Sequence, residues 1–303
     1  MRNIEIAGIG FCSVDYLCIV PHIPLDEKVG AIERLVQGGG ASATAIVAAA
    51  RLGASTAFIG TVGNDQEGNE IIRGLNQENI DTSHIRVKAG KESPVAYCWV
   101  EQKTGKRSIV WDRGTAMPLD AIAIDEGFIS SLKLLHLDGH NTEAAIRAAE
   151  IAKANGVTVS LDAGSILPGI ETLVGLSDIC IASEFFACNY TGENDVEKAV
   201  EKLFTEDKVI VAATMGDKGV VALTHPGIIK RDAFKVPVVD TTGAGDVFHG
   251  AFAYAYLQGW DTRKCLDFAG ATAAIKCTGF GGRTSIPEKN EVIKFLEEKG
   301  ISV

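Results

Sequence analysis

Residues 240–252 read Asp-Thr-Thr-Gly-Ala-Gly-Asp-Val-Phe-His-Gly-Ala-Phe, a run in which a glycine-rich turn meets the start of an apolar repeat. Apolar residues recur at helical spacing beyond Asp246, so the glycines before it form a turn that opens a helix. The β-prone residues at 236–239, with Pro237 among them, predict a strand start or a sheet edge that leads into this turn. The run therefore predicts a strand, a turn and a helix in succession.

The predicted turn has the chemistry of an anion site. The small residues Gly243, Ala244 and Gly245 let backbone amides converge, and the helix dipole adds roughly half a positive charge there. Asp246 is placed to accept a proton from a hydroxyl group that attacks a phosphoryl group, while the amides hold the developing negative charge. The simpler alternative is an ordinary helix start in which Asp246 interacts only with the dipole.

Composition limits the class of protein. With 303 residues, of which 46% are hydrophobic, the chain can bury the core of one large α/β domain, with or without a small appendage. A net charge of −10 argues against nucleic acid or an anionic membrane as a partner, although local amides can still bind an anion such as ATP. Seven scattered cysteines without C-x-x-C spacing, no uninterrupted apolar run of membrane-spanning length and no signal-peptide pattern predict a cytoplasmic protein.

The N-terminal third holds two candidate ligand-binding features. Gly8 and Gly10 approach a dinucleotide fingerprint, but a strand-like segment at 14–20 follows instead of a helix, which argues against that motif. Asp15 interrupts this apolar strand, and it either faces water or accepts hydrogen bonds from sugar hydroxyls. The glycines at 38–40 precede a predicted helix at 41–52, and three in a row indicate either a loop or a close approach of the backbone to another group.

Two sheets are expected. Strand-like segments at 14–20, 29–36, 95–101 and 107–111 predict a small separate sheet. From Leu132 onward, strands and helices alternate, which predicts a mostly parallel, doubly wound sheet with ligands at the carboxyl ends of its strands. Asp138 and His140 follow one such end, as residues that line a pocket or that cap the loop.

The run at 240–252 closely resembles the C-terminal motif of the ribokinase-like (PfkB) sugar kinase family, and residues 38–68 resemble its N-terminal motif. The resemblance covers nearly the whole chain. It implies one ribokinase-like α/β domain over residues 1–303, with a small β-sheet lid inserted at about 12–37 and 93–112. In the family this lid is often a dimer surface, so a homodimer is expected.

The family resemblance also implies an activity and a site. The activity is transfer of the γ-phosphate of ATP to a primary hydroxyl of a sugar, with Asp246 as the catalytic base and the Gly243–Gly245 amides as the anion hole. The implied substrate-binding residues are Asp15, Gly39, Gly40, Asp138 and His140. The implied nucleotide-binding residues are Thr214, Gly216 and Gly219 of a T-x-G-x-x-G turn, together with Thr242, Gly243, Gly245 and Gly270.

The same resemblance also implies binding sites for two ions and a role for one loop. Mg²⁺ accompanies ATP, and Glu184 is the metal-binding candidate, because Ser183-Glu-Phe-Phe186 stands where the family has Asn-x-x-Glu. The loop at 278–287 is expected to close over adenine. The backbone near Asp240 and Thr242 is expected to hold a monovalent cation such as K⁺.

The substrate remains open at this point. Ala43 stands where family members often carry a sugar-binding Asn. Residues 38–45, 246–251 and 276–283 look most like the sulfofructose kinase branch, yet His140 stands where that branch has a basic residue for the sulfonate, and a His is a poorer partner for a permanent anion than Arg. The alternatives are a nucleoside kinase of the same fold and a non-catalytic regulator that binds a sugar or a nucleotide.

Overall fold

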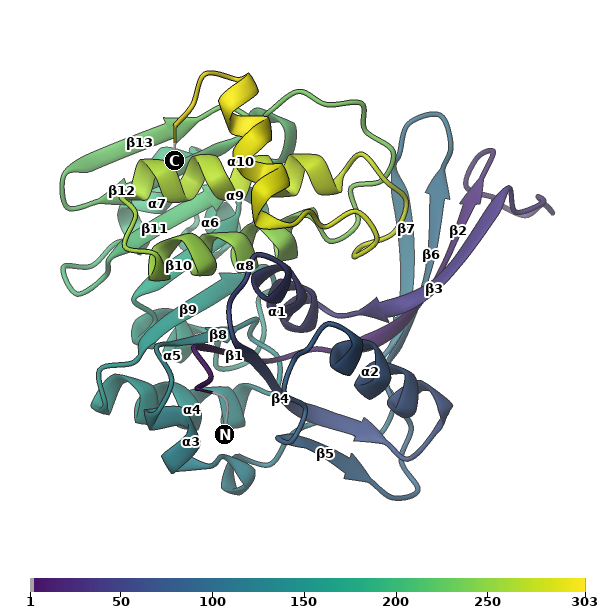
Figure 1. Ribbon diagram of the computed structural model, residues 1–303, viewed down its shortest axis with the longest axis horizontal. Helices are drawn as coiled ribbons and strands as arrows, with labels where there is room; N and C mark the ends of the chain where they lie inside the picture. Colours follow the sequence, from purple (N-terminus) through teal and green to yellow (C-terminus); the bar gives the residue numbers. More distant parts are fainter. Residues whose placement is uncertain (1–2, 303) are drawn as a thin grey trace.

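A nine-stranded sheet forms the centre of the computed structural model, which describes residues 3–302 (Figure 1). The strand order is β13-β12-β11-β10-β9-β8-β1-β4-β5, parallel from β5 to β11 and antiparallel at β12 and β13. The strands are β1 (Ile6–Ile9), β4 (Thr56–Gly63), β5 (Ile85–Lys88), β8 (Leu134–Leu137), β9 (Thr158–Ala163), β10 (Ile179–Ser183), β11 (Ile210–Thr214), β12 (Val220–Thr224) and β13 (Gly227–Arg231). The predicted mostly parallel, doubly wound sheet is confirmed.

The position of β1 within the sheet determines where ligands can bind. The chain leaves β1 toward β4 on one side and later returns to β8 on the other, so the direction of winding reverses at β1. The carboxyl ends of parallel strands on either side of such a reversal border a crevice. Residues just beyond β1, β8 and β9 therefore face one shared space.

Helices cover both faces of the large sheet. One face carries α1 (Ala41–Arg51), α2 (Gln66–Gln77), α8 (Ala244–Leu257), α9 (Thr262–Lys276) and α10 (Lys289–Glu298). The other carries α3 (Glu126–Ser130), α4 (Thr142–Ala154), α5 (Ile170–Leu176), α6 (Glu184–Thr191) and α7 (Val196–Leu203). No helix within residues 3–302 is long and apolar enough to cross a membrane.

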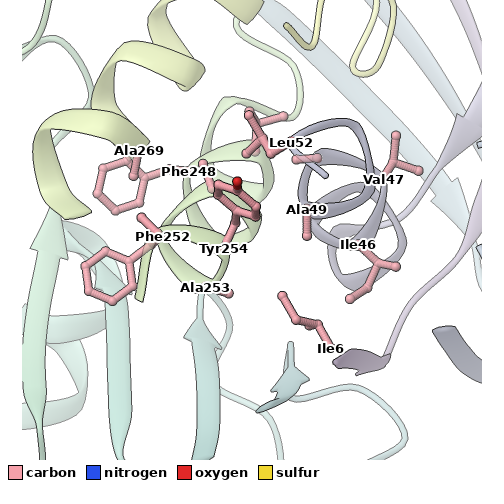
Figure 2. Close-up of a cluster of buried hydrophobic side chains, with 14 of the residues drawn as sticks. Ile6, Ile46, Val47, Ala49, Leu52, Phe248, Phe252, Ala253, Tyr254 and Ala269 are labelled. Carbon is pink, nitrogen blue, oxygen red and sulfur yellow. The ribbon is translucent and has the colours of Figure 1, made fainter. Parts of the chain in front are cut away.

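The packing of α1 against α8 fixes the helix that begins at the glycine-rich turn. Phe248 and Phe252 of α8 lie among buried side chains of α1, α9 and the sheet (Figure 2). Gly250 allows a close approach of the two helices, because a Cβ atom there would lie 2.0 Å from the carbonyl oxygen of Ala45. The start of α8 is thus held firmly over the crevice by its own buried face.

The second sheet has the order β3-β2-β6-β7 and projects to one side of the main body in Figure 1. Its strands are β2 (Ser13–Val20), β3 (Glu33–Gly39), β6 (Val95–Glu101) and β7 (Arg107–Asp112). The predicted separate small sheet is confirmed, and we call it the lid. β2, β6 and β7 match the strand-like segments at 14–20, 95–101 and 107–111, whereas β3 begins and ends later than the predicted segment at 29–36.

One predicted strand is absent. Residues 236–239 precede the glycine-rich turn as an irregular segment, so the expected strand before the turn is wrong. Pro237 has no N–H to donate to a ladder, and the amide of Val239 donates to the carbonyl of Cys277 (2.8 Å) at the end of α9. The Val239 amide therefore donates to the end of a helix and not to a neighbouring strand.

Candidate active site

Asp246 lies in the first turn of α8, directly after the glycine-rich turn. Gly243 precedes the helix with a φ of 74°, a left-handed conformation that favours glycine, and a Cβ atom there would lie 3.0 Å from the carbonyl oxygen of Gly282. None of the described side chains caps this helix N-terminus. The backbone donors and the dipole of α8 are therefore directed at the crevice, and the Asp246 carboxylate stands beside them.

The surroundings of Asp246 suit a general base at neutral pH. Burial raises the pKa of Asp246 to about 7, and the neighbouring Asp162 carboxylate acts in the same direction. The His249 ring acts in the opposite direction, while Asp138 and Arg107 contribute smaller effects of opposite sign. A base with a pKa near the working pH accepts protons efficiently and is still ionised in a large fraction of molecules.

A buried ion pair between His249 and Asp162 lies next to the Asp246 carboxylate. His249, one turn after Asp246 on α8, places Nε2 at 3.2 Å from Oδ1 of Asp162 at the end of β9. The Asp162 carboxylate raises the pKa of His249 against the effect of burial. His136 of β8 lies next to this pair, with ring centroids 5.8 Å apart, and its pKa falls to about 3 because it is buried. The cluster thus places a histidine whose pKa is raised beside one whose pKa is lowered.

The predicted sugar-binding residues Asp15, Gly39 and Gly40 come together where β2 pairs with β3. The Ser13 hydroxyl donates to Oδ1 of Asp15 (2.7 Å), and a Cβ atom on Gly39 would lie 2.1 Å from that carboxylate. Gly40 has a φ of 90°, and a Cβ atom there would lie 2.3 Å from the carbonyl oxygen of Phe11. The consecutive glycines therefore reflect a close approach of the backbone to other groups.

Arg283, in the loop after α9, connects the lid to the main body. Its Nε donates to the Thr44 hydroxyl (3.0 Å) and its Nη2 to the carbonyl of Gly39 (2.7 Å). The carboxylates of Asp15 and Asp246 both oppose the lowering of the Arg283 pKa by burial, so this guanidinium stands within electrostatic reach of both acids. The candidate sugar ligand and the candidate base therefore border the same space.

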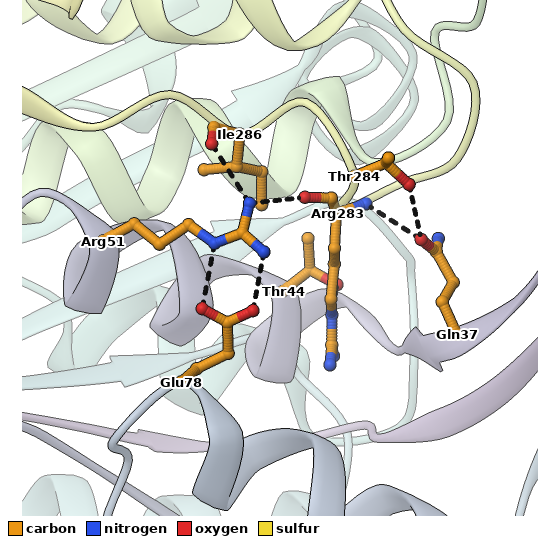
Figure 3. Close-up of polar contacts among 7 residues, drawn as sticks. All are labelled: Gln37, Thr44, Arg51, Glu78, Arg283, Thr284 and Ile286. Atoms are coloured by element: carbon orange, nitrogen blue, oxygen red, sulfur yellow. Dashed lines mark hydrogen bonds and ion pairs between the residues drawn. The ribbon is translucent and has the colours of Figure 1, made fainter.

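A second arginine fixes the backbone of the same loop. Arg51 at the end of α1 donates through Nη1 to the carbonyls of Arg283 (2.8 Å) and Ile286 (3.1 Å), and it forms a two-pronged pair with Glu78 (Figure 3). Gln37 of β3 accepts weaker hydrogen bonds from the loop. The loop over the crevice is thus held to α1, to the segment after α2 and to the lid.

Asp138 and His140 lie just beyond β8, as the sequence predicts, but they differ in their surroundings. The Asp138 carboxylate accepts hydrogen bonds from the amides of Phe11 (2.8 Å), Ser42 (3.0 Å) and His140 (3.0 Å). This buried carboxylate therefore organises three backbone segments, in line with the loop-capping alternative. The His140 ring instead lies against the Phe11 ring, with centroids 5.1 Å apart, and Phe11 in turn meets Trp111 of the lid.

The predicted nucleotide-binding residues Thr214, Gly216 and Gly219 lie at the carboxyl end of β11, four strands from β1 in the sheet. Thr214 ends β11, and the turn after it closes with a hydrogen bond from the Met215 amide to the Gly219 carbonyl (2.8 Å). Gly216 and Gly219 both have positive φ values, of 62° and 97°. Gly270 lies on α9. It faces the ring of Phe234, which belongs to the irregular segment that leads to the glycine-rich turn.

The lid touches the glycine-rich turn directly. Nη1 of Arg107 on β7 donates to the Thr241 hydroxyl (2.8 Å), and the Cys98 thiol on β6 lies 4.0 Å from the Thr242 hydroxyl. The lid strands therefore contact the glycine-rich turn although the two are more than a hundred residues apart in the chain.

The metal candidate Glu184 stands in the first turn of α6, where it pairs with Lys218 of the turn after β11 (3.3 Å). No group of three or more acidic, histidine or cysteine side chains within residues 3–302 has the arrangement of a metal site.

Several residues of the site escaped the sequence interpretation. Asp162 follows a predicted strand as Asp138 does, so its position alone could have marked it. His249 stands within the quoted run, but helical spacing does not reveal its partner. Arg107 carried no local signal of a role, and Lys276 and Arg283 appeared only as the two ends of the family-like segment at 276–283, without a role of their own.

Comparison with known proteins agrees with this geometry. The model of the pfkB carbohydrate kinase family matches residues 4–289. The chain is 33% identical to the ribokinase of Haemophilus influenzae over 302 residues, covering 95% of this chain and 97% of the relative.

Solved structures show the same fold. A putative ribokinase from Agrobacterium tumefaciens superimposes with a TM-score of 0.92 at 28% identity, covering 98% of this chain and 99% of that one. Arabidopsis thaliana ribokinase, in a structure with ribose and ATP, gives a TM-score of 0.85 at 26% identity, with 98% and 99% covered. The chain therefore belongs to the pfkB family of carbohydrate kinases, and it is a phosphotransferase that acts on a hydroxyl group.

Proposed function

We propose that this protein transfers the γ-phosphate of ATP to a primary hydroxyl group of a sugar or sugar derivative. The observation that carries the proposal is that the loop of Arg283 meets both acids' surroundings: Arg283 donates to the carbonyl of Gly39 (2.7 Å), which lies against Asp15, and Gly282 lies against Gly243 of the turn that precedes Asp246. A sugar bound to Asp15 therefore lies within the same pocket as the base. The ribose and ATP bound to the Arabidopsis relative agree with these ligand classes.

The proposed reaction follows from the chain's own groups. Asp15, with Gly39 leaving it room, accepts hydrogen bonds from sugar hydroxyls. Asp246 accepts the proton of the attacking hydroxyl, and the amides of Gly243, Ala244 and Gly245 stabilise the charge on the transferred phosphoryl group. Because the Ala244 amide also lies 3.2 Å from the Thr241 carbonyl, it must exchange this contact for the phosphate. Closure of the lid excludes water, which limits hydrolysis of ATP.

Mg²⁺ would enter with ATP. It supplies positive charge that offsets the charge of the phosphates. Glu184 is the carboxylate that would hold it, and Lys218, now paired with Glu184, would be free to meet a phosphate oxygen. The turn formed by Thr214, Gly216 and Gly219, with Gly270 across the crevice, would hold the nucleoside part.

The proposed substrate site has an aromatic side and a charged side. Phe11, His140 and Trp111 form its aromatic side, and Asp15 with Arg283 forms its charged side. Arg283 is held in place, because its Nε and Nη2 donate hydrogen bonds to Thr44 and Gly39. A neutral sugar suits the Asp15 side, whereas a sugar phosphate or sulfofructose would need His140 or Arg283 as its anion partner.

The aromatic side of the pocket also gives a reason to test nucleosides, because a base can stack on Phe11 or Trp111. A non-catalytic regulator is not favoured, since Asp246 and its supporting ion pair are intact.

The test is ADP release from Mg·ATP with ketoses, aldoses, sugar phosphates, sulfofructose and nucleosides, with Asp246→Asn in parallel. Turnover with one sugar class, reduced about 10²–10⁴-fold in the variant, is expected. A variant rate within about tenfold of the wild type would overturn the role of Asp246. Turnover with nucleosides alone would overturn the sugar assignment.

We also propose that two copies associate through the outer face of the lid. Val36, Tyr97 and Val110 stand in one row across the lid, with Tyr16 of β2 between Val36 and Tyr97, and the three are about half-exposed. A second copy would remove this apolar face from water. Light scattering on the wild type and on Val110→Lys tests this: the wild type should have twice the monomer mass and the variant the monomer mass, and a monomeric wild type would overturn the association.

A further inference from the structure

Lys276, the last residue of α9, is fully buried, with 0% of its surface exposed. Lysine is almost never buried completely unless it is paired. Its Nζ donates to the carbonyl oxygen of Asp240 (2.8 Å), the residue that begins the glycine-rich run. Burial lowers the pKa of Lys276, and the neighbouring Asp240 carboxylate acts in the opposite direction.

All three oxygens of Asp240 are engaged by N–H donors. Oδ1 accepts from the amide of Thr242 (2.8 Å), Oδ2 accepts from the amide of Gly281 (2.9 Å), and the carbonyl accepts from Lys276. A metal cation bound to Asp240 would have to displace an ammonium group or a backbone amide. The residues near Asp240 therefore do not fit the monovalent cation that the family resemblance implies there.

The ammonium stands where two segments of the active site meet. Residue 277 accepts a hydrogen bond from the Val239 amide (2.8 Å), and Gly243 lies against the backbone of Gly282. Lys276 thus joins the turn at 240–243 to the loop at 277–282. The Asp246 carboxylate also acts on Lys276, so the charge lies within electrostatic reach of the base.

We propose that Lys276 is a built-in cation that holds the anion-hole turn in place, so that this enzyme works without a monovalent metal ion. Because the ammonium group is covalently part of α9, it cannot dissociate as a bound metal ion can. It therefore holds the Asp240 carbonyl whatever salt is present. Lys276 is a positioning residue, because it acts on the reacting groups through Asp240 and the backbone of the turn.

Because this role presupposes the proposed phosphoryl transfer, its test has two readouts. The first is kcat/KM at constant ionic strength, with K⁺ replaced by tetramethylammonium. The second is the affinity for Mg·AMP-PNP by titration calorimetry in the same two salts, which reports on the turn even if the sugar has not been identified. For the wild type, both readouts should change less than about twofold. A K⁺ activation above about tenfold would overturn the proposal.

Two variants distinguish the effect of the Lys276 charge from the effect of the space that its side chain fills. Lys276→Ala leaves room for an ion, so its kcat/KM should fall at least about 10²-fold in tetramethylammonium and recover at least tenfold with K⁺ or NH₄⁺. Lys276→Met fills the same space without charge, so it should lose activity equally and not recover. Equal behaviour of the two variants toward K⁺, with both folded by circular dichroism, would overturn the proposal.

The chain offers a matched control for loss of a buried lysine. Lys208 is also buried, and its Nζ donates to the carbonyl of Ser177 (2.8 Å) on the opposite face of the large sheet. Lys208→Met should lower thermal stability without creating any response of kcat/KM to K⁺. A K⁺ response in this variant would show that the effect does not belong to the site of Lys276.

Discussion

The Nε2 atom of His249, one helical turn beyond Asp246 on α8, lies 3.2 Å from Oδ1 of Asp162. This pair brings the end of β9 to the beginning of α8 and sets the charge around Asp246. The His249 ring lowers the pKa of Asp246 and so opposes the raising effect of Asp162.

The first prediction concerns the pH dependence of the reaction. The base acts in its deprotonated form, so kcat/KM of the wild type should fall as the pH drops below about 7, the pKa of Asp246. His249→Gln removes the positive charge and leaves Asp162, so the acid limb should move to higher pH. His225→Gln, which alters an exposed pair with Glu206, should leave the profile unchanged. A shift to lower pH in His249→Gln would contradict this account.

The second prediction is that the buried Asp246 carboxylate lowers the stability of the fold at high pH. The pKa of Asp246 rises from 3.8 to about 7 in the folded protein, so the folded state binds the proton more tightly. The resulting stability is complete below the unfolded pKa and is lost as the pH rises through 7. Asp246→Asn should therefore raise the melting temperature relative to the wild type at pH 8, on the order of 2 °C, and less at pH 5. Thermal unfolding of both proteins across this range gives the answer, and a larger gain at pH 5 would contradict it.

The third prediction concerns the space beside the sugar ligand. Gly39→Ala places a Cβ atom where the Asp15 carboxylate now stands, 2.1 Å away, so that carboxylate must move. The KM for the sugar should rise about tenfold or more, while the KM for ATP changes little. Gly74→Ala on α2 is the control, because nothing lies within 4 Å of its new Cβ atom. An unchanged sugar KM would show that Asp15 does not bind the substrate.

The fourth prediction concerns the loop over the crevice. Arg51→Ala removes the donor that holds the carbonyls of Arg283 and Ile286, and it leaves Glu78 without its partner. We expect the free energy of unfolding to fall by about 1–2 kcal/mol, since the pair is partly exposed, and the KM for ATP to rise roughly three- to tenfold. Chemical denaturation and initial rates measure both. Arg73→Ala, which breaks an exposed pair with Glu70, should change neither quantity.

The fold was predictable because its signals are local. Helical spacing beyond Asp246, the alternation of strands and helices after Leu132 and the strand-like segments of the lid each lie within one short window. The family motifs identified the same elements independently. The exception is residues 236–239, where β propensity was overridden by a hydrogen bond from Val239 to the end of α9.

The sequence by itself therefore determined the two sheets, the turn that opens α8 and the family, because periodicity and motif spacing are properties of neighbouring residues. The tertiary structure determined which distant groups meet: Arg283 with Gly39, His249 with Asp162 and Lys276 with Asp240. These pairings depend on the strand order at β1 and on how closely α8 and α9 pack over the sheet. The spacing of residues along the chain does not predict the distances within these pairs. The distances are set only when the buried faces of the helices pack against the sheet.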